Sequence, residues 1–262
     1  MNTIHKKALV EDNVQLGKKN TIGPHVIIED GVTIGSHNTI GPGVVIFNGT
    51  TIGDGNEIHA GAVIGDTPQD IAFQNKESFV TIGNNNKIRE YVTIHRGTKE
   101  GSATTIGNDN FFMGYTHIAH NCQIGSGVVT VNTVVLGGYV ILEHYSFISA
   151  SVVIHQFCRI GTYAIVSGLS AVNQDIPPFV MCGGRPAVVN GINTVGLKRA
   201  GMKPPIRAEI KQAFKILYRS GLNTENALGK IENECASEEV GQFAIFIKNS
   251  SRGVASFGET RF

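Results

Sequence analysis

The chain lacks tryptophan, closely spaced cysteine pairs, an excess of either charge, and any long apolar run. Its 22 basic and 21 acidic residues give no overall charge that would favour nucleic acid or an acidic membrane surface. No apolar stretch approaches a membrane span, and "MNTIHKKALVEDN" lacks the apolar core of a signal peptide. The four cysteines (Cys122, Cys158, Cys182 and Cys235) have neither metal-binding nor disulfide-scaffold spacing, so we expect a cytoplasmic protein.

An apolar residue instead recurs every six positions, in a chain that contains 32 glycines. The marker positions are Ile4, Val10, Leu16, Ile22, Ile28, Ile34, Ile40, Ile46, Ile52, Ile58, Ile64, Ile82, Ile88, Ile94, Ile106, Phe112, Ile118, Ile124, Thr130, Leu136, Leu142, Ile148, Ile154, Ile160, Val166 and Val172. A period of six fits neither an α-helix nor a lone alternating strand. It indicates a short strand and a tight corner, with the marker turned inward and glycine or asparagine easing the corner.

Three such hexapeptides make a triangular coil of 18 residues, and stacked coils form a parallel β-helix. The markers predict about nine coils, a prism roughly 40 Å tall at the usual strand spacing. The general rule for parallel crossovers favours a right-handed coil. The sequence therefore predicts a mainly β protein.

The repeat predicts a β-helical domain over residues 1–190, with loop insertions at about 65–81 and 96–105. Long loops on a rigid scaffold often carry function, and Gln69 and Asp70 lie beside a proline turn in the first. Residues 191–262 are expected to form a C-terminal helical domain. Its helices are predicted from about Arg207 to Gly221, through "TENALGKIENECA", and after a capping Ser237.

The first of these predicted helices carries a basic stripe of Arg207, Lys211, Lys215 and Arg219 at a spacing of four. Such a stripe is often only a solvated helix face. In an otherwise neutral chain, however, a net charge of +6 between residues 198 and 219 favours an acidic protein partner.

His120 occurs in "MGYTHIAHNCQIG", two positions past its marker, and Gly138 and Gln156 follow at intervals of 18. On a regular coil these three residues stack in one column, about 4.8 Å apart. A histidine beside an approachable glycine N–H supplies a base and an oxyanion donor, which acyl transfer requires.

Three other interpretations of this stretch compete with catalysis. A histidine on the outside of a β-helix is often merely solvated. Zinc binding by imidazoles is possible, but His117 and His120 are an odd number apart and are expected to point to opposite sides. Cys122 could be a nucleophile paired with His120, although a small buried residue is the simpler role.

Several motifs accompany the hexapeptide repeat in a fixed order. They are "QD" in the first loop, "VTIHRGT", "HIAH", "HQFCRIG", "QDIPPFV", "GGRPA", "GIN" and "GLKRAG", followed by the helical tail. Together they resemble the UDP-N-acetylglucosamine O-acyltransferase family over essentially the whole chain. Hexapeptides alone would be less specific, since other acetyltransferases and hydrolases share them.

The resemblance implies a left-handed parallel β-helix, an exception to the crossover rule, and a homotrimer with active sites between neighbouring prisms. It implies transfer of a 3-hydroxyacyl chain from acyl carrier protein to the glucosamine 3-hydroxyl of UDP-N-acetylglucosamine, the first step of lipid A biosynthesis. No metal or diffusible cofactor is implied. The basic helix would receive the acidic carrier protein.

Residue roles follow from the same resemblance. His120 would be the general base, and the Gly138 N–H would hold the thioester oxygen. Gly168 matches a position that limits acyl-chain length. Substrate-binding positions would be Gln69, Asp70, His95, His117, His155, Gln156, Asn193 and Arg199.

The chain departs from the family pattern at four positions. Asn121 replaces an aspartate that would stabilise the protonated base, whereas asparagine can only hydrogen-bond, so slower transfer to a hydroxyl is expected. Tyr139 replaces a histidine of the donor wall. Val195 and Ala200 replace a carboxylate and a second arginine near the nucleotide.

These departures leave three functions open. The first is O-acylation of UDP-N-acetylglucosamine. The second is N-acylation of its 3-amino analogue, because a neutral amine depends less on a strong base. The third is a catalytically weak paralogue that binds sugar nucleotide or carrier protein.

Overall fold

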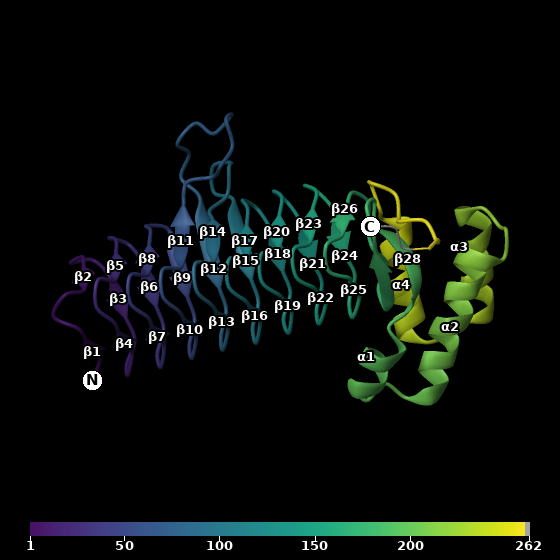
Figure 1. Cartoon of the computed structure of the whole chain (residues 1–262), viewed down its shortest axis with the longest axis horizontal. Helices are drawn as coiled ribbons and strands as arrows, with labels where there is room; N and C mark the ends of the chain where they lie inside the picture. The colour runs from purple at the N-terminus through teal and green to yellow at the C-terminus, as the bar shows by residue number, and fades with distance from the viewer. Residues whose placement is uncertain (260–262) are drawn as a thin grey trace.

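The computed structural model describes residues 1–259 and consists of a long β-prism with helices at one end (Figure 1). Residues 260–262, the end of the predicted helical domain, lie outside the described residues. All 26 marker positions lie in the short strands β1–β26, which confirms the six-residue period. No helix within residues 1–259 is long and apolar enough to cross a membrane.

The strands form three sheets, one for each face of the prism, and successive strands from β1 to β27 belong to different sheets, whereas β28 pairs antiparallel with β27. The first sheet has 11 strands: β1 (Thr3–Ile4), β4 (Thr21–Ile22), β7 (Thr39–Ile40), β10 (Glu57–Ile58), β13 (Lys87–Ile88), β16 (Phe111–Phe112), β19 (Val129–Thr130), β22 (Phe147–Ile148), β25 (Ile165–Val166), β27 (Val180–Gly183) and β28 (Val188–Ile192). The second has nine: β2 (Leu9–Val10), β5 (Ile27–Ile28), β8 (Val45–Ile46), β11 (Val63–Asp66), β14 (Thr93–His95), β17 (His117–Ile118), β20 (Val135–Leu136), β23 (Val153–Ile154) and β26 (Ala171–Val172). The third has eight: β3 (Gln15–Leu16), β6 (Thr33–Ile34), β9 (Thr50–Ile52), β12 (Phe79–Ile82), β15 (Ala103–Ile106), β18 (Gln123–Ile124), β21 (Ile141–Leu142) and β24 (Arg159–Ile160).

The markers fill the interior of the prism, as their β-branched character predicts. From Ile22 onward they are buried, and Thr130 is the one polar member. The first coil is different: Ile4 is 46% exposed because no coil stacks on its outer side.

The glycine after a marker has a different role from the one expected. A Cβ built on Gly53 would lie 2.8 Å from the Gly83 carbonyl oxygen, so glycine is needed for close stacking of coils. The left-handed corner conformation occurs two residues later instead. Side chains as large as Tyr139 (φ 60°) and Phe157 (φ 67°) adopt it, and these two stack with ring centroids 5.0 Å apart.

Buried asparagines form a ladder along one corner, although the sequence analysis did not single them out. The ladder comprises Asn20, Asn38, Asn56, Asn86 and Asn110. Each Oδ1 up to that of Asn86 accepts the backbone N–H of the next asparagine, at 2.7–3.0 Å. These bonds satisfy corner amides that no backbone carbonyl reaches.

Two loops rise from the same side of the prism, between β11 and β12 and between β14 and β15 (Figure 1). Beyond β28 come α1 (Thr194–Arg199), α2 (Pro204–Arg219), α3 (Thr224–Glu234) and α4 (Glu238–Lys248). The last three helices confirm the predicted ones, whereas α1 was not predicted. Ser237 occupies the N-cap position of α4, but its hydroxyl makes no capping hydrogen bond within the described chain. The chain then returns to the prism, where the Ser250 hydroxyl donates to buried Asp175 at 2.7 Å.

Candidate functional site

A cavity of about 410 Å³ opens on the sheet that contains β14, β17, β20 and β23. It brings together seven residues that the sequence analysis assigned to the site: Gln69, His95, His117, His120, Gly138, His155 and Gln156. The first loop contributes Gln69, and the other six come from three successive coils and the strand β14. The cavity therefore joins residues up to 87 positions apart in sequence.

His120, Gly138 and Gln156 stack in one column, as predicted. The parallel register pairs His117 with Val135 and Val135 with Val153, which places residues 120, 138 and 156 in equivalent corners. A Cβ built on Gly138 would lie 2.5 Å from His120 Nε2 and 2.9 Å from Nδ1. Only glycine allows the imidazole to lie flat against this backbone.

The backbone N–H of Gly138 is available to a ligand. In earlier coils the amides at the same corner position are occupied, because Asp30 N and Asn48 N donate to the carboxylates of Glu11 and Glu29. Within residues 1–259, the Gly138 N–H has no such acceptor. An unpaired N–H beside an imidazole can hold a developing oxyanion.

His120 is oriented by its neighbour Asn121. Its Nδ1 lies 3.1 Å from Asn121 Oδ1, and Asn121 is 6% exposed. The Tyr139 ring meets the His120 imidazole edge to face, with centroids 5.4 Å apart. The imidazole is thus held on two sides, and its Nε2 edge lies against Gly138.

His117 and His95 form the wall beside His120, with their ring centroids 5.2 Å apart. The expectation that His117 and His120 point to opposite sides was wrong. The strand β17 ends at Ile118, and the corner that follows turns His120 back toward the cavity. Alternation holds only within a strand, and this strand has two residues.

Both wall histidines present defined hydrogen-bonding groups. Burial, with smaller effects from His95 and His120, lowers the pKa of His117 to about 4, so its ring is neutral at pH 7. Thr93 Oγ1 lies 2.8 Å from His117 Nδ1. His95 is 4% exposed and donates from Nδ1 to the Thr67 carbonyl at 2.7 Å, and its Nε2 is buried without a partner among the described residues.

Four of the predicted site residues lie outside this cavity. Asp70 accepts the N–H of Ala72 at 2.9 Å, as in a turn within the first loop. Gly168 lies farther along the prism, where an added Cβ would come within 3.3 Å of the Ala150 carbonyl. Asn193 and Arg199 belong to the α1 segment at the end of the prism (Figure 1).

Asn193 already has two partners inside the chain. Its Oδ1 caps α1 by accepting the Gly196 N–H at 2.9 Å, and its Nδ2 donates to the Tyr163 carbonyl at 2.8 Å. The side chain is buried, at 5% exposure. Asn193 therefore fixes the start of the helix on which Arg199 is exposed.

Cys122 is not positioned for nucleophilic chemistry. Its side chain is fully buried, and its Sγ donates to the Gly137 carbonyl at 3.2 Å. Burial raises the pKa of the thiol to about 12, so the thiolate is scarce at neutral pH. Nowhere in residues 1–259 do three or more His, Cys, Asp or Glu side chains gather in a way that could hold a metal ion.

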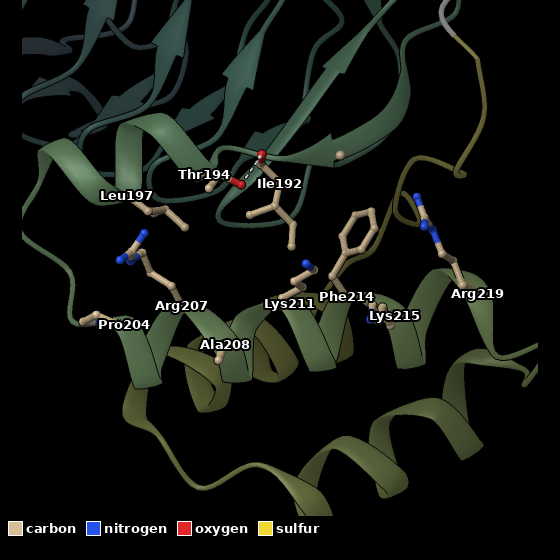
Figure 2. A pocket seen from close by; sticks show the side chains of 11 residues that line it. Ile192, Thr194, Leu197, Pro204, Arg207, Ala208, Lys211, Phe214, Lys215 and Arg219 are labelled. Carbon is tan, nitrogen blue, oxygen red and sulfur yellow. Dashed lines mark hydrogen bonds between the residues drawn. The ribbon is translucent and has the colours of Figure 1, made fainter.

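A second groove of about 410 Å³ lies between α2, α1 and β28 (Figure 2). Its apolar floor includes Ile192, Leu197 and Phe214. Four cations border it: Arg207, Lys211, Lys215 and Arg219. No acidic residue lines the groove. The predicted basic stripe therefore borders a groove that has an apolar floor and only positively charged groups around it.

Thr98 is the polar group near His120 that the sequence analysis missed. It lies in the second loop, and its N–H and hydroxyl both donate to Asn121 Oδ1 at 3.0 Å. The motif "VTIHRGT" contains this threonine, but only the loop path shows where its side chain lies.

Comparison with protein families matches residues 175–255 to the second domain of UDP-N-acetylglucosamine O-acyltransferase. Residues 7–48 and 103–138 match the bacterial transferase hexapeptide repeat.

Curated relatives carry the name acyl-[acyl-carrier-protein]–UDP-N-acetylglucosamine O-acyltransferase. The protein from Aquifex aeolicus is 51% identical over 194 residues, which cover 73% of this chain and 74% of the relative. The protein from Synechocystis is 42% identical over 188 residues, covering 72% and 68%.

Solved structures agree over nearly the full length. The UDP-N-acetylglucosamine acyltransferase from Bacteroides fragilis superposes with a TM-score of 0.93 at 42% identity, over 96% of this chain and 99% of that one. The enzyme from Francisella novicida gives 0.93 at 37% identity, over 97% and 94%. The prism is accordingly a left-handed parallel β-helix, and the right-handed coil favoured by the crossover rule is wrong.

Proposed function

The chain belongs to the acyl-[acyl-carrier-protein]–UDP-N-acetylglucosamine O-acyltransferase family, and we propose that it performs this reaction with His120 as general base. The substrates are a 3-hydroxyacyl chain on acyl carrier protein and the glucosamine 3-hydroxyl of UDP-N-acetylglucosamine. The reaction is the first step of lipid A biosynthesis. The column of His120 and Gly138 is the observation that carries the proposal.

In the proposed reaction, His120 Nε2 removes the proton of the sugar 3-hydroxyl as its oxygen attacks the thioester carbonyl. The Gly138 N–H holds the oxyanion of the tetrahedral intermediate. When the carbon–sulfur bond breaks, the carrier thiolate leaves and takes the proton from the imidazolium. The products are the ester and the free carrier thiol, and no cofactor is consumed.

The wall of the cavity provides the sugar contacts. The neutral His117 ring and the buried, unpartnered Nε2 of His95 offer hydrogen-bonding groups suited to sugar hydroxyls. Gln69 on the first loop, together with His155 and Gln156, completes the substrate and donor walls, and Asp70 beside it would contact the substrate from outside the cavity. Gly168 then lies along the acyl-chain path, where glycine leaves room for a longer chain.

The nucleotide is proposed to bind between two prisms of a homotrimer. Arg199 lies at the end of the prism, outside the His120 cavity, so a neighbouring subunit would supply it to this site. Asn193 acts there by fixing the start of α1. Val195 and Ala200 on the same segment would leave fewer charged contacts to the uridine diphosphate than the family pattern provides.

The groove beside α2 is the proposed docking surface for acyl carrier protein (Figure 2). Its four cations complement an acidic helix, and its apolar floor can accept one apolar side chain of the partner. The unpaired cysteines, of which three are buried, are compatible with reaction in the reducing cytoplasm.

Asn121 supports a second candidate, acylation of the 3-amino analogue. A neutral amide beside the base stabilises the imidazolium less than a carboxylate would. A neutral amine is the better nucleophile and places less demand on the base. The two acceptors give different bonds, an ester or an amide.

One assay distinguishes these functions. Purified protein is mixed with 3-hydroxyacyl carrier proteins of several chain lengths and with each sugar nucleotide, and the products are identified by mass spectrometry. An ester product supports the proposed function, and an amide product supports the second candidate. Binding without turnover, unchanged in His120→Ala, would identify a catalytically weak paralogue and contradict the proposed mechanism.

A further inference from the structure

Asn121 occupies a buried corner beside the base, in the left-handed conformation at φ 59°. Three groups surround its Oδ1: the Thr98 N–H at 3.0 Å, the Thr98 hydroxyl at 3.0 Å, and His120 Nδ1 at 3.1 Å. An amide oxygen with three donors around it is fully engaged.

The Thr98 backbone fixes which way this amide faces. A backbone N–H can only donate, so the Asn121 atom that it meets must be the oxygen and not the amino group. The same oxygen faces His120 Nδ1, which must therefore carry a proton. In the neutral ring Nε2 is then the unprotonated nitrogen, and it lies on the side of Gly138.

Tyr139 extends the chain of hydrogen bonds by one group. Thr98 uses its hydroxyl proton toward Asn121, so the oxygen 3.1 Å from Tyr139 Oη accepts the phenol proton. The Tyr139 ring is held in place by stacking on Phe157, at 5.0 Å and 20°. The Tyr139 hydroxyl thus donates to Thr98, and Thr98 and His120 both donate to Asn121 Oδ1, so these bonds converge on one oxygen and fix its position.

We propose that Thr98 and Tyr139 are positioning residues that act through Asn121 to hold His120 as the Nδ1–H tautomer, with Nε2 free to take the substrate proton. This inference rests on the proposed role of His120 as base. It assigns a function to the second loop, whose residue Thr98 links Tyr139 to Asn121 by hydrogen bonds. It also connects two departures from the family pattern, Asn121 and Tyr139, which form one uncharged network through Thr98.

The tautomer can be measured directly by ¹⁵N magic-angle-spinning NMR of protein labelled at histidine. Protonated and unprotonated ring nitrogens have well-separated shifts, and His120 is assigned by its absence from the His120→Gln spectrum. At pH 7.5 we expect His120 to show a protonated Nδ1 and an unprotonated Nε2. In Asn121→Leu the acceptor is lost, and the proton is expected to shift partly to Nε2. Leucine is tolerated in this corner conformation, as Leu169 shows at φ 61°.

Kinetics provide a second readout that loss of structure alone would not reproduce. We expect kcat to fall about 100-fold in Asn121→Leu and about 10-fold in Thr98→Val, with KM for both substrates within about threefold. Tyr139→Phe keeps the ring packing and should lose about threefold in kcat. Because Tyr139 acts through Thr98, the double variant should be no slower than Thr98→Val alone.

Tyr145→Phe is the matched control, since Tyr145 takes the same corner conformation and stacks on Tyr163 but makes no hydroxyl bond to this network. Its kcat should equal that of the wild type. A wild-type His120 with its proton on Nε2 would overturn the inference, as would wild-type kcat in both Asn121→Leu and Thr98→Val. If instead His120→Ala retains full activity, the proposed role of His120 as base fails, whatever the tautomer.

Discussion

The position of the His120 imidazole depends on the absence of a side chain at Gly138, because the ring lies against the Gly138 Cα. In Gly138→Ala the new Cβ would overlap the ring and displace it. A displacement of about 1 Å costs roughly 100-fold in rate, and we expect a loss of this size in kcat. Steady-state kinetics would measure it.

Gly241→Ala controls for the substitution itself, because Gly241 lies in α4 with no atom near an added Cβ. Its activity should be unchanged. Full activity in Gly138→Ala would show that the glycine is not needed beside the base.

His117 gives the protein a defined pH dependence of stability. Burial lowers its pKa to about 4, while the unfolded chain titrates near the ordinary 6.5. Between these values the unfolded state binds more protons, so stability from neutral His117 is complete above pH 6.5 and is lost as pH falls toward 4. When the pH is lowered from 7 to 5, we expect the Tm of His117→Gln to fall by less than the Tm of the wild type. An equal loss in scanning calorimetry would contradict this assignment.

At the scale of structural elements, the asparagine ladder replaces backbone pairing at one corner of the prism. Asn56→Ala removes the acceptor of the Asn86 N–H and leaves that amide buried and unpaired. The cost should be about 1–3 kcal/mol in the free energy of unfolding, measured by urea denaturation.

Asn132→Ala is the comparison for this change, since Asn132 is exposed and uses only its backbone carbonyl in hydrogen bonds within the described chain. It should alter stability by no more than about 0.5 kcal/mol. Equal effects of the two substitutions would show that the ladder contributes little.

The helix α2 is proposed to recognise the carrier protein by charge. Lys215→Glu places a carboxylate at the edge of the groove, so we expect KM for the acyl carrier substrate to rise about tenfold with little change in kcat. The effect should shrink as ionic strength rises. Lys230→Glu on α3, where Lys230 faces Glu234, should leave KM unchanged; equal KM values for the two variants would place the carrier elsewhere.

These elements differ in how far the sequence predicts them. The hexapeptide period is local and repeated, so each strand is marked by its own residues. The asparagine ladder was also present as a spacing of 18 between Asn20, Asn38 and Asn56 but was not recognised. By contrast, α1 is six residues long and contains Gly196 and two β-branched residues, which give no helical pattern.

For the molecule as a whole, the stacking of coils brings residues 18 positions apart into contact. The column of His120 and Gly138 was predictable because both lie on the same regular coil. The link from Thr98 to Tyr139 was not, since it spans 41 residues and depends on the path of the second loop. The departures Asn121 and Tyr139 were visible in sequence, but their connection through Thr98 appears only in the fold.

The whole fold also places the His120 cavity, on β17 and β20, midway along the prism and apart from the helices at its end (Figure 1). The proposed recognition of the carrier at α2 and the proposed catalysis at β17 and β20 therefore belong to separate elements. A substitution at one should leave the other intact.

The most direct test of the central claim is single-turnover transfer from 3-hydroxyacyl carrier protein to UDP-N-acetylglucosamine by His120→Ala and by His144→Asn. His144 caps Ser126 N on another corner, as Asn84 and Asn108 cap their neighbours, so asparagine should preserve that bond and full activity. We expect His120→Ala to bind the sugar nucleotide normally and to transfer the acyl chain at least about 1,000-fold more slowly. Transfer by His120→Ala within a few-fold of the wild-type rate would show that His120 is not the base.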